Sequence, residues 1–161
     1  MKVIAFEVDH GDVIKPCYGY RFEYGGRVVV LPSDTRYNAN VIKYGAGADL
    51  LVHEVASAPP ELMKEARIQR IVGHHTTPSE AGRVFDQTKP KLAAYTHLVL
   101  LGSETIPAPS IAEIVAETRQ TYGGPLVVGE DLMTFEIGDA VSVRRFQPSS
   151  APAEKQMLRD T

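Results

Sequence analysis

Several histidine and aspartate side chains stand where a predicted strand has just ended. They are His10, Asp34, His53 and His97, and the pair at 74–75 directly precedes a predicted helix. Strand ends that border loops are where α/β folds collect ligands and metal ions. Imidazole nitrogen and carboxylate oxygen together suit zinc, manganese or iron. These positions therefore form the first candidate for a site.

Each of these residues also has a purely structural interpretation. Asp34, followed by Thr35, is typical of a turn or a helix cap. His53 could hydrogen-bond a neighbouring backbone group and nothing else. The spacing does not form a compact metal motif such as HExxH, in which one helix face presents both ligands. From the residues alone, a metal site and a set of structural polar residues both remain open.

The elements that would position these residues follow from hydrophobic periodicity and turn signals. Predicted strands cover 3–8, 18–24, 27–31, 49–52, 92–96, 126–128, 133–136 and 140–143, and predicted helices cover 37–44, 60–68, 77–88 and 109–121. Gly25-Gly26 between two β-rich runs predicts a hairpin. Thr77 and Glu80, with Pro78 between them, predict a capped helix start. This order predicts an α/β fold, a mainly β sheet with helices packed on one face.

Composition narrows the class of protein. A formal net charge of −3, a pI near 5.9 and the absence of a Lys/Arg run argue against autonomous nucleic-acid binding. No apolar stretch approaches the roughly 20 residues of a membrane helix, and the first strand begins too early for a signal peptide. The single cysteine, Cys17, fits a reducing compartment. We therefore expect a soluble cytoplasmic protein with one domain over 1–146 and a disordered Ser/Pro/Ala-rich tail over 147–161.

An ordered set of segments resembles the metallo-β-lactamase superfamily, and within it the ribonuclease Z-like branch. The segments are VDHG at 8–11, YGYRF at 18–22, SDTR at 33–36, LLVHE at 50–54, HTTPSEAGR at 75–83, LAAYTH at 92–97 and GEDLM at 129–133. Together they span nearly the whole chain. The resemblance implies a metal-dependent hydrolase that acts on a phosphodiester or another ester.

The resemblance also implies roles for individual residues. His10, Asp34 and His97 match metal ligands, with the Asp34 carboxylate bridging two ions. His75 matches a histidine that contacts the scissile phosphate and assists the leaving group, and Glu54 matches an acid that supports it. Two cations would lower the pKa of a bridging water and stabilise charge on phosphorus, while an imidazole donates a proton. Zinc, manganese and iron all suit this ligand set.

The chain also departs from the family pattern. The HxHxDH motif, which supplies further ligands to both ions, is absent. The matched region therefore resembles the C-terminal half of a four-layer αββα sandwich, and Ser33 stands where the family commonly has Gly, which predicts a crowded turn. Three ligands shared between two ions predict weak metal binding or none, and no turnover by the isolated chain.

Half of such a sandwich would leave one apolar sheet face uncovered, which predicts association. A second copy of the chain in a homodimer, or a missing N-terminal half, would cover it. Two functional classes follow. One is a hydrolase of small-molecule or phosphodiester substrates that is inactive as this half alone. The alternative is a non-catalytic scaffold or interaction module that retains the fold.

Overall fold

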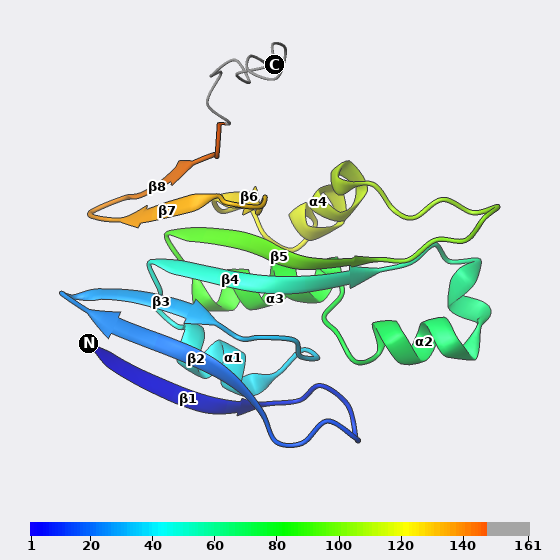
Figure 1. Cartoon of the computed structure of the whole chain (residues 1–161), viewed down its shortest axis with the longest axis horizontal. Helices are drawn as coiled ribbons and strands as arrows, with labels where there is room; N and C mark the ends of the chain where they lie inside the picture. Colours follow the sequence, from blue (N-terminus) through cyan, green and yellow to red (C-terminus); the bar gives the residue numbers. More distant parts are fainter. Residues whose placement is uncertain (148–161) are drawn as a thin grey trace, which may run out of the picture.

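The protein forms a six-stranded mixed sheet with a separate two-stranded hairpin, in a computed structural model that describes residues 1–147 (Figure 1). The strands are β1 (Lys2–Val8), β2 (Cys17–Tyr24), β3 (Arg27–Leu31), β4 (Leu50–Ser57), β5 (Leu92–Leu100), β6 (Leu126–Val128), β7 (Thr134–Ile137) and β8 (Val141–Arg144). The helices are α1 (Ala39–Gly45), the 3-10 turn η1 (Leu62–Lys64), α2 (Ala66–Val72), α3 (Pro78–Thr88) and α4 (Ile111–Arg119). The predicted α/β class is confirmed.

Strand order in the sheet is β1-β2-β3-β4-β5-β6. The first three strands pair antiparallel, and β3 to β6 pair parallel. Parallel strands place their carboxyl ends at one edge of the sheet, where loops can gather ligands. The sheet topology thus places the loops after β3, β4 and β5 at one edge.

One face of the sheet is covered by helices, and Figure 1 shows α1 and α3 behind the strands. Phe85 of α3 lies at the centre of this core, in ring contact with Tyr95 and Tyr122 at centroid distances of 5.6 and 5.5 Å. The helix is held in place by its predicted start. The Thr77 side chain accepts the Glu80 N–H, and the Glu80 carboxylate accepts the Thr77 N–H. Such a capping box satisfies backbone donors that would otherwise lack partners.

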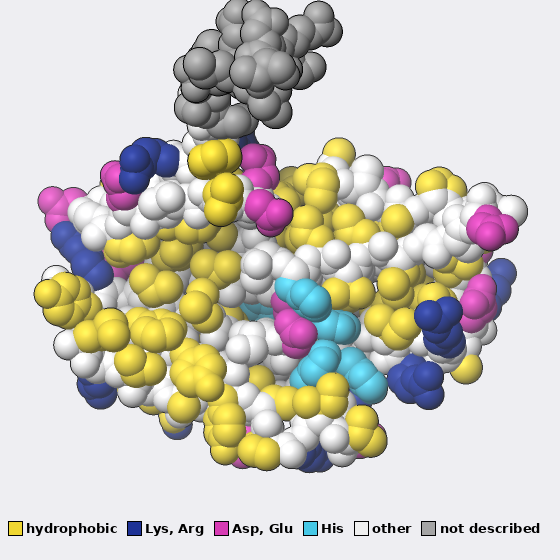
Figure 2. Space-filling view, in the orientation of Figure 1, with side chains coloured by type: hydrophobic (Ala, Val, Ile, Leu, Met, Phe, Trp, Pro, Cys, Tyr) yellow, Lys and Arg dark blue, Asp and Glu magenta, His cyan; other side chains and the backbone are white. Residues whose placement is uncertain are grey.

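The opposite face of the sheet is covered only in part. Leu50, Leu92 and Ala94 are buried there against the side chains of the β7–β8 hairpin. Further along the sheet, β2 alternates so that its aromatic residues share this face, and Tyr18, Tyr20 and Tyr24 are exposed. Figure 2 shows the resulting apolar surface beside the histidines. We call this open surface the tyrosine face; it consists of Val3, Tyr18, Tyr20, Phe22, Tyr24, Val29 and Leu31.

Three predicted elements differ clearly from the structure. The strands predicted over 49–52 and 92–96 continue to Ser57 and Leu100, so His53 and His97 lie inside strands and not just after them. The helix predicted over 60–68 is instead η1 followed by α2. Glu65 separates these two because its backbone is extended, with φ −86° and ψ 125°.

The disordered tail predicted over 147–161 lies, from residue 148, outside the described residues. Within residues 1–147, no helix combines the length and apolar character that crossing a bilayer requires.

Candidate metal centre

His10 is positioned by a backbone carbonyl on a distant loop. Its Nδ1 lies 2.9 Å from the His74 carbonyl oxygen. A carbonyl only accepts hydrogen bonds, so Nδ1 must carry the proton, and in neutral His10 the Nε2 lone pair remains free for a ligand. Gly11 permits this contact, because a Cβ there would lie 2.8 Å from the His74 ring and its φ is +89°.

Asp34 lies on the loop that follows β3, and hydrogen bonds join this loop to the loops that follow β1 and α2. The Thr35 hydroxyl accepts the Asp9 N–H at 3.2 Å, and the Thr76 hydroxyl donates to the Thr35 carbonyl at 2.6 Å. Ser33, directly before Asp34, has a φ of +62°. That left-handed conformation favours glycine, which gives a physical reason for the crowded turn predicted there.

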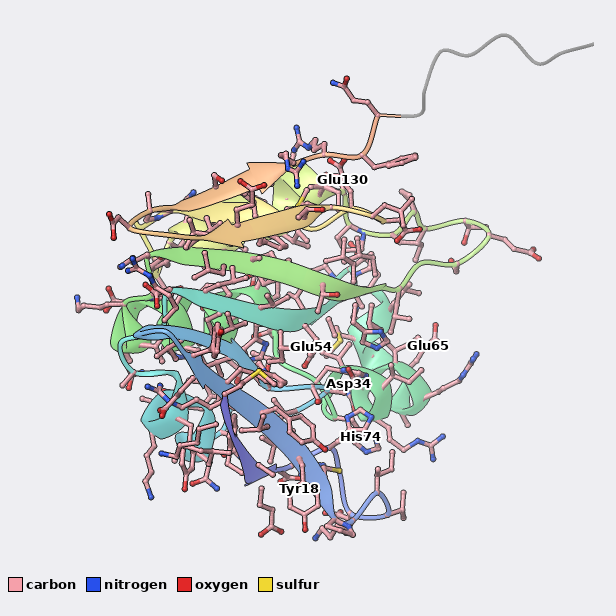
Figure 3. All side chains as sticks on the ribbon, turned by 60° about the vertical axis from the view of Figure 1, so that its left-hand side comes forward. Tyr18, Asp34, Glu54, Glu65, His74 and Glu130 are labelled. Carbon is pink, nitrogen blue, oxygen red and sulfur yellow. The ribbon has the colours of Figure 1, made fainter. Side chains whose placement is uncertain are left out.

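Glu54 connects the Asp34 loop to His75. Its carboxylate is only 1% exposed and accepts the Thr76 N–H at 2.8 Å and the Thr35 N–H at 3.5 Å. The same carboxylate lies 3.2 Å from His75 Nδ1. The hydrogen bond that His75 donates to Glu54 raises the pKa of His75, against the opposing effect of burial, and the charges of Glu54 and Asp34 raise it further. Figure 3 shows Glu54 and Asp34 near each other at this edge of the sheet.

His97 is aimed at Asp34 by a β-bulge. His53 pairs with Tyr95 and Val55 pairs with Leu98, so β5 carries one more residue than β4 across this step. His97 has a φ of +43° at the bulge, and its Nε2 lies 3.4 Å from Asp34 Oδ2. Bulges beside functional sites commonly redirect a side chain in this way. A strand that simply ended before His97 would not provide this constraint.

The structure therefore brings all of the predicted site residues to one place. Ligand atoms of His10, Asp34 and His75 lie within 4.8 Å of one another. The ring of His75 lies 4.8 Å from that of His10 and 5.6 Å from that of His97. Figure 2 shows the histidines gathered around an acidic side chain. Around a tetrahedral zinc ion the ligand atoms lie roughly 3.5 Å apart, so modest side-chain rotation would let this set hold one ion.

Of the two interpretations that the sequence left open, the structural one applies to His53. It is fully buried, its Nδ1 donates to the Glu54 carbonyl at 2.8 Å, and its ring packs against Phe85. Burial lowers its pKa, and among the described residues its Nε2 has no hydrogen-bond partner. Sequence reasoning missed the role of His74, whose carbonyl orients His10. A backbone contact of this kind leaves no signal in the residue type.

Comparisons with known proteins agree with this geometry. The chain is 29% identical over 130 residues to ribonuclease Z of Myxococcus xanthus, a match of 81% of this chain and 39% of that protein. It is 34% identical over 128 residues to ribonuclease Z of Haloarcula marismortui, covering 78% of this chain and 38% of that protein. No family model matches the chain.

Solved structures share the fold. The metallo-β-lactamase-fold protein YhfI from Bacillus subtilis aligns with a TM-score of 0.60 at 20% identity, over 88% of this chain and 49% of that one. Human tRNase Z, short form, aligns with a TM-score of 0.54 at 22% identity, over 84% and 43%. The chain belongs to the metallo-β-lactamase superfamily and is ribonuclease Z-like. The chain spans about two fifths of the length of the curated relatives it matches.

Proposed function

We propose that this chain supplies one side of the metal centre of a hydrolase that cleaves a phosphodiester or another ester. The observation that carries the proposal is the convergence of ligand atoms from His10, Asp34 and His75, with His97 3.4 Å from Asp34. Segments 8–11, 33–36, 75–83 and 92–97 are far apart in sequence, and only the fold brings their polar residues together. The match to proteins named ribonuclease Z supports the same class of chemistry.

In this proposal His10, Asp34 and His97 hold metal, with zinc, manganese or iron all compatible with the donors. A bound ion would supply an activated water and charge stabilisation at the scissile group. His75 keeps Nδ1 on Glu54, so its Nε2 faces away from that bond. In the protonated imidazolium form, which Glu54 favours by raising the pKa of His75, Nε2 can donate its proton to the leaving oxygen. The position of His75 near His10 and Asp34 also permits an alternative in which His75 replaces His97 as a ligand.

One ion held by three side chains keeps an open position that a water molecule or a substrate oxygen can fill. The exposed apolar face of the sheet indicates a partner. We propose a second copy as the partner, docked on the tyrosine face. This face consists of Val3, Tyr18, Tyr20, Phe22, Tyr24, Val29 and Leu31 on β1, β2 and β3. Cross-strand pairs such as Tyr20 with Leu31 and Phe22 with Val29 make it continuous. A two-fold axis would pair this face with the same face of the second copy, as in isologous dimers. We propose the cytoplasm as the compartment of this protein, because the single cysteine of the chain, Cys17, is a free thiol and fits a reducing environment.

The partner proposal is tested by the mass in solution. We expect a dimer in sedimentation, and we expect Tyr20→Asp to give a monomer because it places a charge in the buried interface. Lys43→Glu on the exposed side of α1 is the matched control and should leave the mass unchanged. A monomeric wild-type chain would exclude the second copy.

The function proposal is tested by metal content and turnover on one sample. After dialysis against zinc we expect substoichiometric metal that is lost in Asp34→Ala, and no hydrolysis of bis(p-nitrophenyl) phosphate by the isolated chain. Equal metal in the chain and in Asp34→Ala would instead support a non-catalytic scaffold. Robust turnover that Asp34→Ala abolishes would show that the site is complete without further ligands.

A further inference from the structure

A cavity of about 390 Å³ lies beside the candidate metal centre, between β5 and the loop that joins β6 to β7. His97 lines it on one side, and Glu130 and Asp131 line it on the other. The same His97 reaches Asp34, so the cavity directly adjoins the group of side chains described above. Figure 3 shows Glu130 above Asp34 and Glu54.

The floor of this cavity is apolar. It is formed by Val52 of the sheet, by Met133 and by Phe135 of the hairpin. Phe135 is partly buried against the second apolar cluster of the protein. A floor of this kind accommodates an alkyl or aromatic group and excludes a strongly hydrated one.

The acidic loop is held firmly in place. Gly129 donates its N–H to the Tyr95 carbonyl at 2.8 Å, and a Cβ at Gly129 would lie 2.5 Å from that oxygen. The Met133 N–H bonds the Glu130 carbonyl at 3.1 Å, and Leu132 has a φ of +63°. This tight turn fixes the backbone of Glu130 and Asp131 at the rim of the cavity.

The two carboxylates differ in their partners. The Glu130 carboxylate lies 3.0 Å from Arg145 Nε and so has an ion-pair partner. Asp131 has no ion-pair partner within residues 1–147. The unpaired charge at the rim is thus that of Asp131, and it would repel an anion and attract a cation or a hydrogen-bond donor.

We infer that this cavity binds the part of the substrate next to the scissile bond and selects a compact alkyl or aromatic group that bears a cationic or hydrogen-bond-donating substituent. The inference rests on the proposed function, since it treats His97 as part of the reacting centre. Asp131 is the specificity-determining residue. A polyanionic group fits this position poorly, so any phosphodiester backbone must leave the metal centre in another direction.

The test is a titration of the full chain with benzylammonium, benzyl alcohol and benzoate, followed by amide chemical shifts in NMR. We expect benzylammonium to shift Gly129, Leu98 and Phe135 saturably, with affinity at least about tenfold higher than that of benzoate. Asp131→Asn should reduce benzylammonium binding to the level of benzyl alcohol. Asp86→Asn, an identical charge change on the exposed side of α3, should have no effect.

Three results would overturn the inference: equal affinity for benzylammonium and benzoate, equal effects of the two asparagine variants, or shifts that map away from the cavity. The titration uses neither metal nor turnover. It can therefore fail while the hydrolase proposal stands, and it can succeed where that proposal fails.

Discussion

Replacing Glu54 by glutamine should both destabilise the protein and change the tautomer of His75. The Glu54 carboxylate accepts N–H groups of Thr76 and Thr35 on Oε1, and it faces His75 Nδ1 with Oε2. A glutamine that keeps its oxygen toward Thr76 must point its NH₂ group at His75. His75 can then keep a hydrogen bond only by accepting at Nδ1, which moves its proton to Nε2.

The magnitude follows from these contacts. Hydrogen bonds to a charged group contribute about 1.5–3 kcal/mol each, and neutral ones contribute about 1 kcal/mol. Converting the charged acceptor to a neutral amide should therefore lower the free energy of unfolding by about 2 kcal/mol. Glu65→Gln, an identical change at the exposed residue before α2, should change it by less than about 0.5 kcal/mol.

The assay combines urea unfolding with ¹⁵N shifts of the imidazole rings in the folded state. The reasoning requires a lower unfolding midpoint for the Glu54 variant and a His75 ring whose protonated nitrogen has changed from Nδ1 to Nε2. A Glu54→Gln protein as stable as the Glu65 variant, with an unchanged His75 ring, would refute the role given to this carboxylate.

Three further predictions concern stability. Burial lowers the pKa of His53, so His53 takes up a proton in the unfolded chain before it does so in the folded protein as pH falls. The free energy of unfolding should therefore decrease below about pH 6.5, by up to about 1.4 kcal/mol at pH 5.5. In urea titrations at both pH values, His53→Leu should remove that dependence, and an unchanged pH profile would contradict it. Ser33→Gly should raise the free energy of unfolding by up to about 1 kcal/mol, or leave it unchanged, because a left-handed backbone favours glycine. A clear destabilisation in urea would refute the strain. Thr77→Ala should cost about 1 kcal/mol by removing the cap of α3, whereas Thr105→Ala in an exposed loop should cost little, and equal thermal midpoints would show that the cap contributes nothing.

Much of the fold followed from local patterns. Gly25-Gly26 marked the hairpin and Thr77-Pro78 marked the start of α3, because turn and cap chemistry is confined to a few residues. The lengths of β4 and β5 did not follow. His53 and Glu54 are polar, so the sequence suggested a strand end. Inside the sheet, the Glu54 carboxylate accepts the Thr76 N–H, and the His53 ring packs against Phe85.

The candidate site could be predicted as a set of residues and not as an arrangement. Polar residues next to predicted elements indicated His10, Asp34, His97 and the histidine pair at 74–75. The family resemblance added Glu54 and the role of each residue. The bulge at His97 and the carbonyl of His74 that orients His10 depend on contacts between distant segments. Those contacts are set by packing, which no local pattern encodes.

The central claim is that His10, Asp34 and their histidine neighbours form a metal-binding group. The most direct measurement is a zinc titration followed by the imidazole ring signals of the five histidines. We predict saturable shifts at His10 and at His75 or His97, with a dissociation constant in the micromolar range or weaker, about −8 kcal/mol at most, and their loss in Asp34→Ala. Shifts that are absent, or that persist unchanged in Asp34→Ala, would contradict the claim.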